Sequence, residues 1–159
     1  MTGREFEMPD FNNMPNLQFI FGSLLFIANR IDTLLERELR VFNVTAKQWF
    51  MSIIIYSLFE SPPTIKEVAR VMGSTHQNVK QVALKLAEKN LLILEKDKND
   101  RRATRLVPTE FSTEFWARTD TAGADFIGKL FADLSDDDLT AVRAVLLKLW
   151  HNLDTMQES

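Results

Sequence analysis

Residues 64–109, which read TIKEVARVMGSTHQNVKQVALKLAEKNLLILEKDKNDRRATRLVPT, decide the fold of this chain. Thr64 and Glu67 have the spacing of a capping box, and apolar residues follow at helical spacing until Gly73. A second helix begins directly afterwards, at Thr75 or the serine before it, and its apolar residues form one face. Two short helices joined by a tight, glycine-containing turn predict a helix-turn-helix.

Two short strands are expected after the second helix. Asn90 stands where a left-handed C-cap is needed, and residues 91–96 and 103–107 are apolar runs of strand length. The polar segment between them has the Asn and Asp residues of a hairpin tip. The order helix, helix, hairpin is that of a winged helix, and a capped helix before it extends the module to residues 45–109. The expected DNA-binding region is therefore residues 45–109.

Amide and cationic side chains lie on the face of the second helix opposite its apolar stripe. Such groups suit hydrogen bonds to base edges and contacts with phosphates, whereas arginines on a thin hairpin tip suit a minor groove. A solvated cluster of ion pairs is the alternative for the hairpin. The candidate DNA contacts are Gln77, Asn78, Lys80 and Gln81 for bases, Lys85 for phosphate, Thr75 and His76 at the helix start, and Lys98, Arg101 and Arg102 on the hairpin.

The charge distribution agrees with this assignment although the net charge of the chain is -3. Residues 64–105 contain ten Lys and Arg against five Asp and Glu, a charge of +5, so the remainder must carry -8 to give that total. A basic module on an acidic body directs one face towards a polyanion.

The helices on either side of the module are unusually apolar. Residues 17–41 predict one long helix that is apolar nearly all round in its first half. Residues 110–156 predict a helix interrupted or kinked near Gly123 and Gly128, and then a last helix capped at Ser135. Such faces need a cover, and a second copy of the chain is the expected one. The fold class is mainly α, a winged helix-turn-helix with a two-stranded wing and terminal dimerisation helices.

Several classes of function lack support in the sequence. The chain has no cysteine, two histidines far apart, and no phosphate-binding glycine motif, so no enzyme activity, metal or cofactor is expected. Residues 1–16 have no periodicity and are expected to be an arm rather than a signal peptide. The apolar run from Leu17 to Ala28 is shorter than the ~20 residues that span a bilayer, so we expect a cytoplasmic protein with no membrane partner.

Four segments in this order resemble the MarR family of bacterial transcription regulators: VTAKQW (44–49), GSTHQNVKQ (73–81), DKNDRR (97–102) and LSDDDLTAVRAVLLKLWHNL (134–153). The resemblance covers residues 17–154. Two departures are Asn90, where the family often has Gly, and VPTEF (107–111), which replaces the usual segment after the wing.

The resemblance implies a homodimer that binds double-stranded DNA at an inverted-repeat operator, with repression as the expected mode. It also implies that one wing arginine enters the minor groove while a wing aspartate orients it. Counting back from Thr109 favours Arg102 and Asp100 for these roles, and Arg101 could replace Arg102. The alternative function is a winged helix that binds another protein and not DNA.

Relatives of this kind often bind a small aromatic or amphipathic effector between the dimerisation helices and the winged module. The resemblance therefore suggests an effector pocket in this chain, although an aromatic residue at each candidate position is more often part of the core. These candidates are Phe19, Phe26, Trp49, Phe50 and Trp116.

Overall fold

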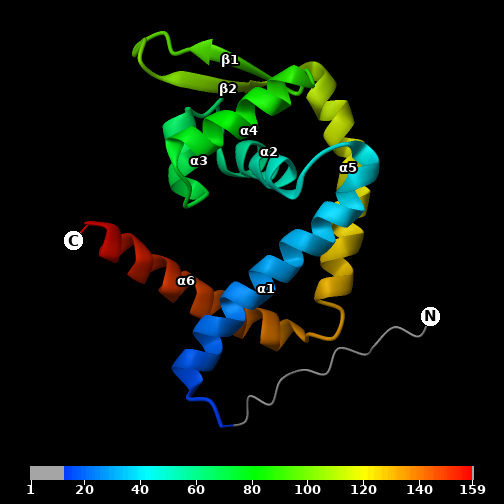
Figure 1. Ribbon diagram of the computed structural model, residues 1–159, viewed down its shortest axis with the longest axis vertical. Helices are drawn as coiled ribbons and strands as arrows, with labels where there is room; N and C mark the ends of the chain where they lie inside the picture. Colours follow the sequence, from blue (N-terminus) through cyan, green and yellow to red (C-terminus); the bar gives the residue numbers. More distant parts are fainter. Residues whose placement is uncertain (1–12, 159) are drawn as a thin grey trace. The chain divides into compact units, whose positions relative to one another are not determined.

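The computed structural model describes residues 13–158, so most of the arm expected over residues 1–16 lies outside them. The elements, in chain order (Figure 1), are α1 (Asn16–Leu39), the 3-10 turn η1 (Arg40–Phe42), α2 (Ala46–Leu58), α3 (Ile65–Val71), α4 (His76–Glu88), β1 (Leu92–Lys96), β2 (Thr104–Pro108), α5 (Glu110–Leu130) and α6 (Asp136–Glu158). The chain divides after Gly123 into two compact units. The mainly α winged-helix architecture predicted from the sequence is confirmed.

The helix boundaries follow from the capping residues. Thr45 with Gln48 and Thr64 with Glu67 both form complete capping boxes, in which each side chain satisfies a backbone N–H at the helix start. At the other end of α3 and α4, Gly73 and Asn90 take left-handed φ values of 57°. Asparagine tolerates this conformation, which explains how the chain departs from glycine at this position without losing the turn.

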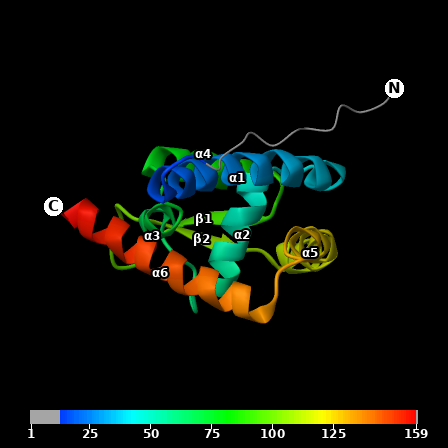
Figure 2. The ribbon, with the colours of Figure 1, turned by 90° about the horizontal axis from the view of Figure 1, so that it is seen from below.

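The two strands form an antiparallel hairpin, with Leu92 opposite Pro108 and Lys96 opposite Thr104. One face of this hairpin is covered, because β1 packs against α4 and β2 against α3 (Figure 2). Leu92 and Leu106 are buried there, and Leu91 just before the strand is buried as well. The hairpin is therefore held on the helix-turn-helix through apolar contacts at its base, while its tip extends beyond them.

The core of the first unit surrounds α2, which contacts α1, α3 and α4. Buried apolar residues come from every one of these elements and include Leu39, Met51, Ile54, Ile65, Val68, Val79, Ala83 and Leu86. The apolar face of α4 is held in this core. The core therefore determines the direction in which the opposite, exposed face of α4 is presented.

Helix α5 is continuous from Glu110 to Leu130, so the interruption expected near Gly123 and Gly128 is wrong. Gly123 is buried against Trp49 of α2, and a Cβ atom built on it would lie 2.4 Å from Trp49 Cζ2. Glycine is needed at this position for close approach of a large side chain, not for a break in the helix. Thr109 caps the helix start, because its hydroxyl oxygen accepts the N–H of Ser112 (3.0 Å).

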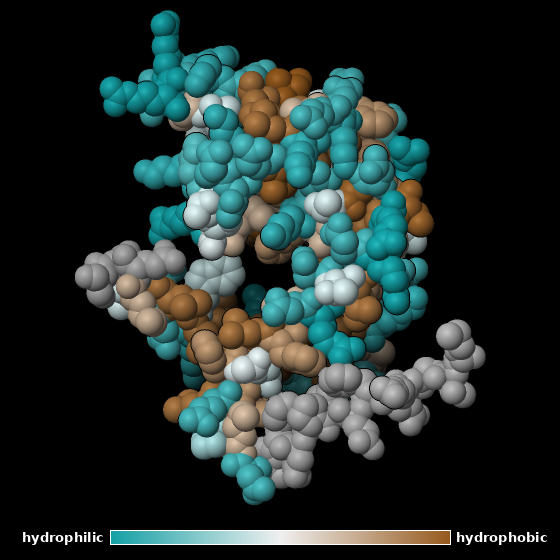
Figure 3. Space-filling model, in the orientation of Figure 1, coloured by the Kyte–Doolittle hydropathy of each residue, from teal (hydrophilic) through white to brown (hydrophobic). Residues whose placement is uncertain are grey.

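The first half of α1 exposes its apolar side chains, among them Leu17 (84% exposed) and Phe21 (67%) (Figure 3). Residues Asn16–Phe42 are long and apolar enough to cross a membrane by length and composition. The expectation of no membrane span was based on the shorter run Leu17 to Ala28. The candidate span extends beyond Ala28, although its second half contains six charged residues: Arg30, Asp32, Glu36, Arg37, Glu38 and Arg40. A helix buried inside a protein meets the same criterion, so this face needs a cover of protein or lipid.

The second unit contains the end of α5 and all of α6. The predicted cap is present, since Ser135 Oγ accepts the N–H of Asp138 (3.2 Å) and the Asp138 carboxylate accepts the N–H of Ser135 (3.0 Å). Hydrogen bonds to Ser135 lower the pKa of Asp138. Along α6 the apolar side chains of Val145, Trp150 and Leu153 are more than half exposed.

Candidate nucleic-acid interface

Helix α4 presents its polar side chains outward because its apolar positions are taken by the core. Val79, Ala83 and Leu86 recur on one face and are buried, and Val82 beside them is half-buried. Thr75 caps the helix, and its hydroxyl oxygen accepts the N–H of Asn78 (3.2 Å). The side chains on the remaining face are consequently free of the core and open to solvent.

All of the predicted helix contacts lie on the exposed part of this surface. They are Thr75, His76, Gln77, Asn78, Lys80, Gln81 and Lys85. The sequence thus places amide and ammonium donors together along one helix, in the combination that suits base edges and phosphates. Their individual roles stay predictions.

The tip of the hairpin brings the second set of predicted contacts together. Lys98, Asp100, Arg101 and Arg102 are all exposed there, and the space-filling view shows hydrophilic residues over this end of the wing (Figure 3). Asp100 accepts the backbone N–H of Arg102 through Oδ1 (2.9 Å). The predicted aspartate therefore contacts the main chain of the predicted arginine and stabilises the turn. The side chains of Arg101 and Arg102 remain exposed to solvent.

The base of the wing contains a buried carboxylate that the sequence-based site did not include. Asp97 is 7% exposed, and its Oδ1 accepts the N–H groups of Asn99 (2.8 Å) and Asp100 (2.7 Å). Its other oxygen accepts a hydrogen bond from Arg105 Nε. The Asp100 N–H, followed by Arg105 and the Asn99 N–H, lowers the pKa of Asp97.

Arg105 connects Asp97 at the base of the wing to the segment just before α3. Its Nη1 donates to the carbonyl oxygen of Pro62 (2.6 Å), and its backbone forms an isolated antiparallel bridge with Thr64. The tip of the wing, the strand β2 and the start of α3 are therefore linked through one guanidinium group. Asp at the first position of a turn commonly accepts the N–H groups that follow it, so the two backbone contacts of Asp97 could be predicted from the sequence. Its ion pair with Arg105, eight residues later, could not.

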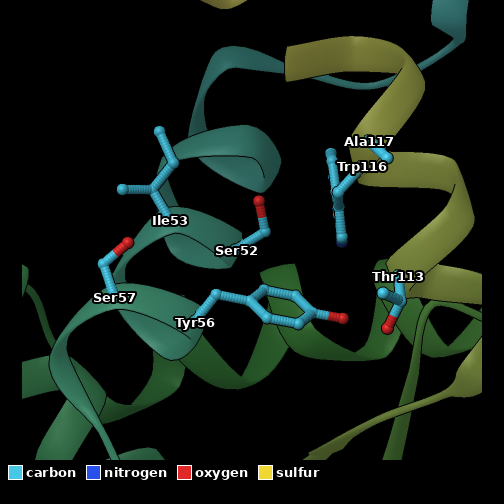
Figure 4. Close-up of a pocket in the computed structure, with 7 residues that line it drawn as sticks. All are labelled: Ser52, Ile53, Tyr56, Ser57, Thr113, Trp116 and Ala117. Carbon is cyan, nitrogen blue, oxygen red and sulfur yellow. The ribbon is translucent and has the colours of Figure 1, made fainter.

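A pocket of about 280 Å³ lies between α2 and α5 in the first unit. Figure 4 shows the side chains of α2 and α5 facing each other across it, with Tyr56 reaching towards α5. Its walls combine apolar groups with hydroxyls, and the Tyr56 hydroxyl is hydrogen-bonded to Ser112 Oγ. The lining residues are Ser52, Ile53, Tyr56, Ser57, Thr113, Trp116 and Ala117.

Of the five aromatic residues suggested for an effector pocket, Trp116 lines this one. Phe19, Phe26 and Phe50 are exposed on α1 and α2. Trp49 is buried against Gly123, and its Nε1 has no hydrogen-bond partner within the residues that the structure describes. The sequence missed the polar lining because serine, threonine and tyrosine at these positions have no pattern that separates a pocket from an ordinary helix contact.

Nothing in the described part of the chain gathers three or more His, Cys, Asp or Glu side chains in a position to hold a metal ion. The chemistry that the exposed groups of α4 and the wing can perform is hydrogen bonding and charge pairing. Both are means by which proteins bind nucleic acids.

Comparisons with known proteins identify the fold. No protein-family model matches the sequence. Among solved structures, the chain is similar to AbsC, a MarR family regulator from Streptomyces coelicolor, with a TM-score of 0.76 and 19% identity over 95% of this chain and 99% of that one. It is also similar to MepR from S. aureus, solved in a complex with DNA (TM-score 0.73, 18% identity, 85% of this chain and 96% of that one).

A third similar structure is the organohalide-sensing transcriptional regulator RdhR in its 2,4-dichlorophenol-bound form. Its TM-score is 0.75, with 14% identity over 96% of this chain and 89% of that one. At these identities the likeness is one of fold, and it extends over the wing and the flanking helices together. The chain has the winged-helix fold of the MarR family of transcriptional regulators.

Proposed function

We propose that this protein is a sequence-specific DNA-binding transcription regulator that acts as a homodimer on an inverted-repeat operator, with repression as its mode. The observation that carries the proposal is the exposed polar face of α4 beside an exposed arginine-bearing wing. MepR, which has a similar fold, was solved bound to DNA. In this proposal α4 is the recognition helix, and the protein acts in a bacterial cytoplasm, where its operator lies.

The charge distribution supports nucleic acid over protein as the partner. The segment from Thr64 to Arg105 carries +5, and the rest of the chain -8. The ion pair of the buried Asp97 with the partly exposed Arg105 is internal to this segment, and the remaining cations of the segment are distributed over α3, α4 and the wing. A positive module attracts the phosphate backbone, and the acidic remainder disfavours binding through the opposite face.

The homodimer is proposed from the exposed apolar faces of α1 and α6, taken separately. Each exposes large aliphatic and aromatic side chains that a monomer would leave in water. We assign residues 17–41 and 110–156 to dimerisation and residues 45–109 to DNA binding. A two-fold dimer presents two copies of α4 to half-sites about one helical turn apart, which gives the operator its inverted repeat.

The pocket between α2 and α5 is the proposed effector site. Its volume of about 280 Å³ is near the lower end for small-molecule sites, and Trp116 with Tyr56 offers aromatic contact beside four hydroxyl groups. RdhR was solved with a chlorinated phenol bound. A small aromatic molecule with one polar group suits the lining described here, because its ring can stack on Trp116 while its polar group meets Ser52, Ser57 or Thr113.

The first experiment is to crosslink the protein in cells, sequence the DNA that co-purifies with it, and measure binding to the recovered sequence. Gln81→Ala should relax the preference at one base pair by roughly 1–3 kcal/mol. Glu60→Ala, at an exposed position between α2 and α3 that is neither a predicted contact nor part of the dimerisation region, serves as the control and should bind like the unaltered protein.

The alternative is a winged helix that binds protein. It would be favoured if the crosslinked DNA carries no common motif and if Gln77→Ala and Gln81→Ala leave affinity for every tested duplex unchanged. A motif that is read by either glutamine excludes it.

A further inference from the structure

We propose that Lys89 is a positioning residue that fixes α4 against the corner between α1 and α2, and thereby determines which half-site spacing the dimer accepts. This inference rests on the proposed DNA-binding function. It concerns the frame that holds the recognition helix, not the side chains that contact DNA.

Lys89 connects the end of α4 to a distant part of the chain. Its Nζ donates to the carbonyl oxygen of Asn43, which lies 46 residues earlier, and to Gln48 Oε1 (3.0 Å). Gln48 is only 2% exposed, and the same oxygen accepts the backbone N–H of Thr45 (3.1 Å). One buried amide oxygen therefore joins the cap of α2 to the end of the recognition helix.

The corner that receives Lys89 is itself fixed to α1. Asn43 adopts a left-handed φ of 56°, and its N–H donates to the carbonyl of Arg40 at the end of the long helix (3.0 Å). The carboxylate of Glu36, one turn earlier in α1, accepts the N–H of Ala46 at the start of α2 (2.7 Å). A displacement of α1 is thus transmitted to the same few residues that Lys89 holds.

The other end of the link is equally well determined. Lys89 is the C-cap of α4, and the following Asn90 takes the left-handed conformation. The N–H of Leu91 returns to the carbonyl of Leu86 (2.9 Å), and Leu91 is buried. The backbone that carries the Lys89 side chain has little freedom, so the ammonium group acts between two ordered segments rather than from a mobile tail.

These contacts have a geometric consequence in a two-fold dimer. The dimerisation helices set the positions of the two winged modules, and the half-site spacing follows from the separation and rotation of the two recognition helices. Each inserted base pair moves one half-site along the axis and rotates it around the duplex by about a tenth of a turn. A dimer whose α4 is fixed to α1 accepts one spacing, whereas a dimer whose α4 can tilt tolerates several.

The test uses the full chain and operators whose half-sites are moved apart or together by one base pair at a time. For the unaltered protein we expect binding to weaken by about tenfold or more at each non-cognate spacing. Lys89→Met keeps the aliphatic stem and removes both hydrogen bonds. For this variant, binding at the same non-cognate spacings should weaken by only about threefold or less. Lys89→Arg, which keeps a cationic donor, should restore most of the original preference.

Lys47→Met is the matched control, because it removes the same charge from an exposed lysine next to Gln48. It should keep the original spacing profile even if overall affinity falls slightly. Melting temperatures of all variants are measured in parallel, since a purely structural role would lower stability without altering the profile. If Lys89→Met does not fold, Lys89→Leu, whose side chain also has no hydrogen-bond donor, provides the same comparison.

An unchanged spacing profile in a folded Lys89→Met protein, or the same flattening in Lys47→Met, overturns the proposal for Lys89. Failure of the proposed function has a different result, because the unaltered protein would then bind no operator at any spacing. The two failures are therefore distinguishable in one set of binding curves.

Discussion

Asp97 determines the conformation of the wing at its base, although it is one of the least exposed charged side chains there. Its two oxygens receive two backbone N–H groups and the guanidinium of Arg105. A carboxylate with this many donors is stabilised in its charged form, which is why its pKa is lowered from 3.8. The conformation of the wing tip, which carries the exposed charged side chains, therefore depends on the buried carboxylate of Asp97.

This arrangement predicts how stability depends on pH. Because the folded-state pKa of Asp97 is below 3.8, the stabilisation is fully present above that value and is lost as the pH falls through the lower folded-state pKa. Asp97→Asn should therefore lower the melting temperature at neutral pH. In this variant the melting temperature should also decrease less than in the original protein when the pH is lowered below about 4. Thermal unfolding followed across this range measures both effects.

Glu114→Gln, which neutralises an exposed carboxylate on α5, is the control and should reproduce the original pH profile. Some acid sensitivity will remain in Asp97→Asn, because hydrogen bonds from Thr64 also lower the pKa of Glu67. A melting temperature of Asp97→Asn that equals the original at neutral pH would contradict the role given to Asp97.

Gly123 gives a second prediction at the scale of one residue. Gly123→Ala would place a methyl group 2.4 Å from Trp49 Cζ2, so α5 or the indole must shift, and we expect a loss of about 1–3 kcal/mol in unfolding free energy. Gly128→Ala on the same helix has nothing within 4 Å of the new methyl and should stabilise by up to ~1 kcal/mol. Denaturant unfolding of both variants checks the contrast, and equal effects would mean that close packing is not the reason for Gly123.

Among the elements, the wing carries the most specific expectation about DNA. If Arg102 enters a minor groove, Arg102→Ala should weaken operator binding and reduce the slope of log affinity against log salt by about one unit per lost contact. The effect should be largest on operators with A·T flanks, where the narrow groove has the most negative potential. Binding measured over a salt series, with Arg101→Ala beside it, shows which arginine has this role.

Lys47→Ala, at an exposed position on α2 outside the predicted contacts and the dimerisation region, controls for the loss of a positive charge. If both wing variants keep the original affinity and slope, the wing makes no contribution and the protein-binding alternative gains support. A solvated cluster of ion pairs, worth ~0–1 kcal/mol, would give that outcome.

The elements themselves were largely predictable because their boundaries are decided locally. A capping box needs residues three apart, and the left-handed positions at Gly73 and Asn90 follow directly after an apolar helical pattern. The continuity of α5 was not predictable from a glycine alone, because Gly123 is explained by Trp49, which lies in another helix.

The links between elements escaped the sequence for the same reason. Lys89 and Asn43 are 46 residues apart, and nothing in the local pattern of either residue names the other as its partner. The exposed face of α4 was accessible to prediction because burial of Val79, Ala83 and Leu86 determines it by periodicity. Of the five aromatic residues that the sequence suggested for an effector pocket, Trp116 lines the pocket between α2 and α5, and the hydroxyl-bearing residues that line it were not suggested.

At the scale of the whole molecule, the exposed apolar face of α1 predicts assembly. The protein should sediment as a dimer at micromolar concentration, because side chains such as Phe21 are 67% exposed in one copy. Phe21→Glu should shift the equilibrium towards monomer, since a carboxylate in an apolar interface loses its hydration. Sedimentation equilibrium of both proteins tests this, with Lys66→Glu on α3 as a control for added negative charge.

The same face could instead be covered by lipid, and the two covers give different results. A dimer leaves the protein in solution when it is mixed with lipid vesicles and centrifuged, whereas a membrane helix floats with the vesicles. A stable monomer together with flotation would contradict the assignment of α1 to dimerisation.

The positions of the tryptophans give the protein an optical reporter of its own. Trp49 on α2 and Trp116 on α5 are only 7% and 6% exposed within a single copy, so their emission should be blue-shifted relative to that of tryptophan in water. Trp116 is the one that lines the pocket. An aromatic compound that enters should quench the blue-shifted part of the emission first, which allows a compound collection to be screened without any label.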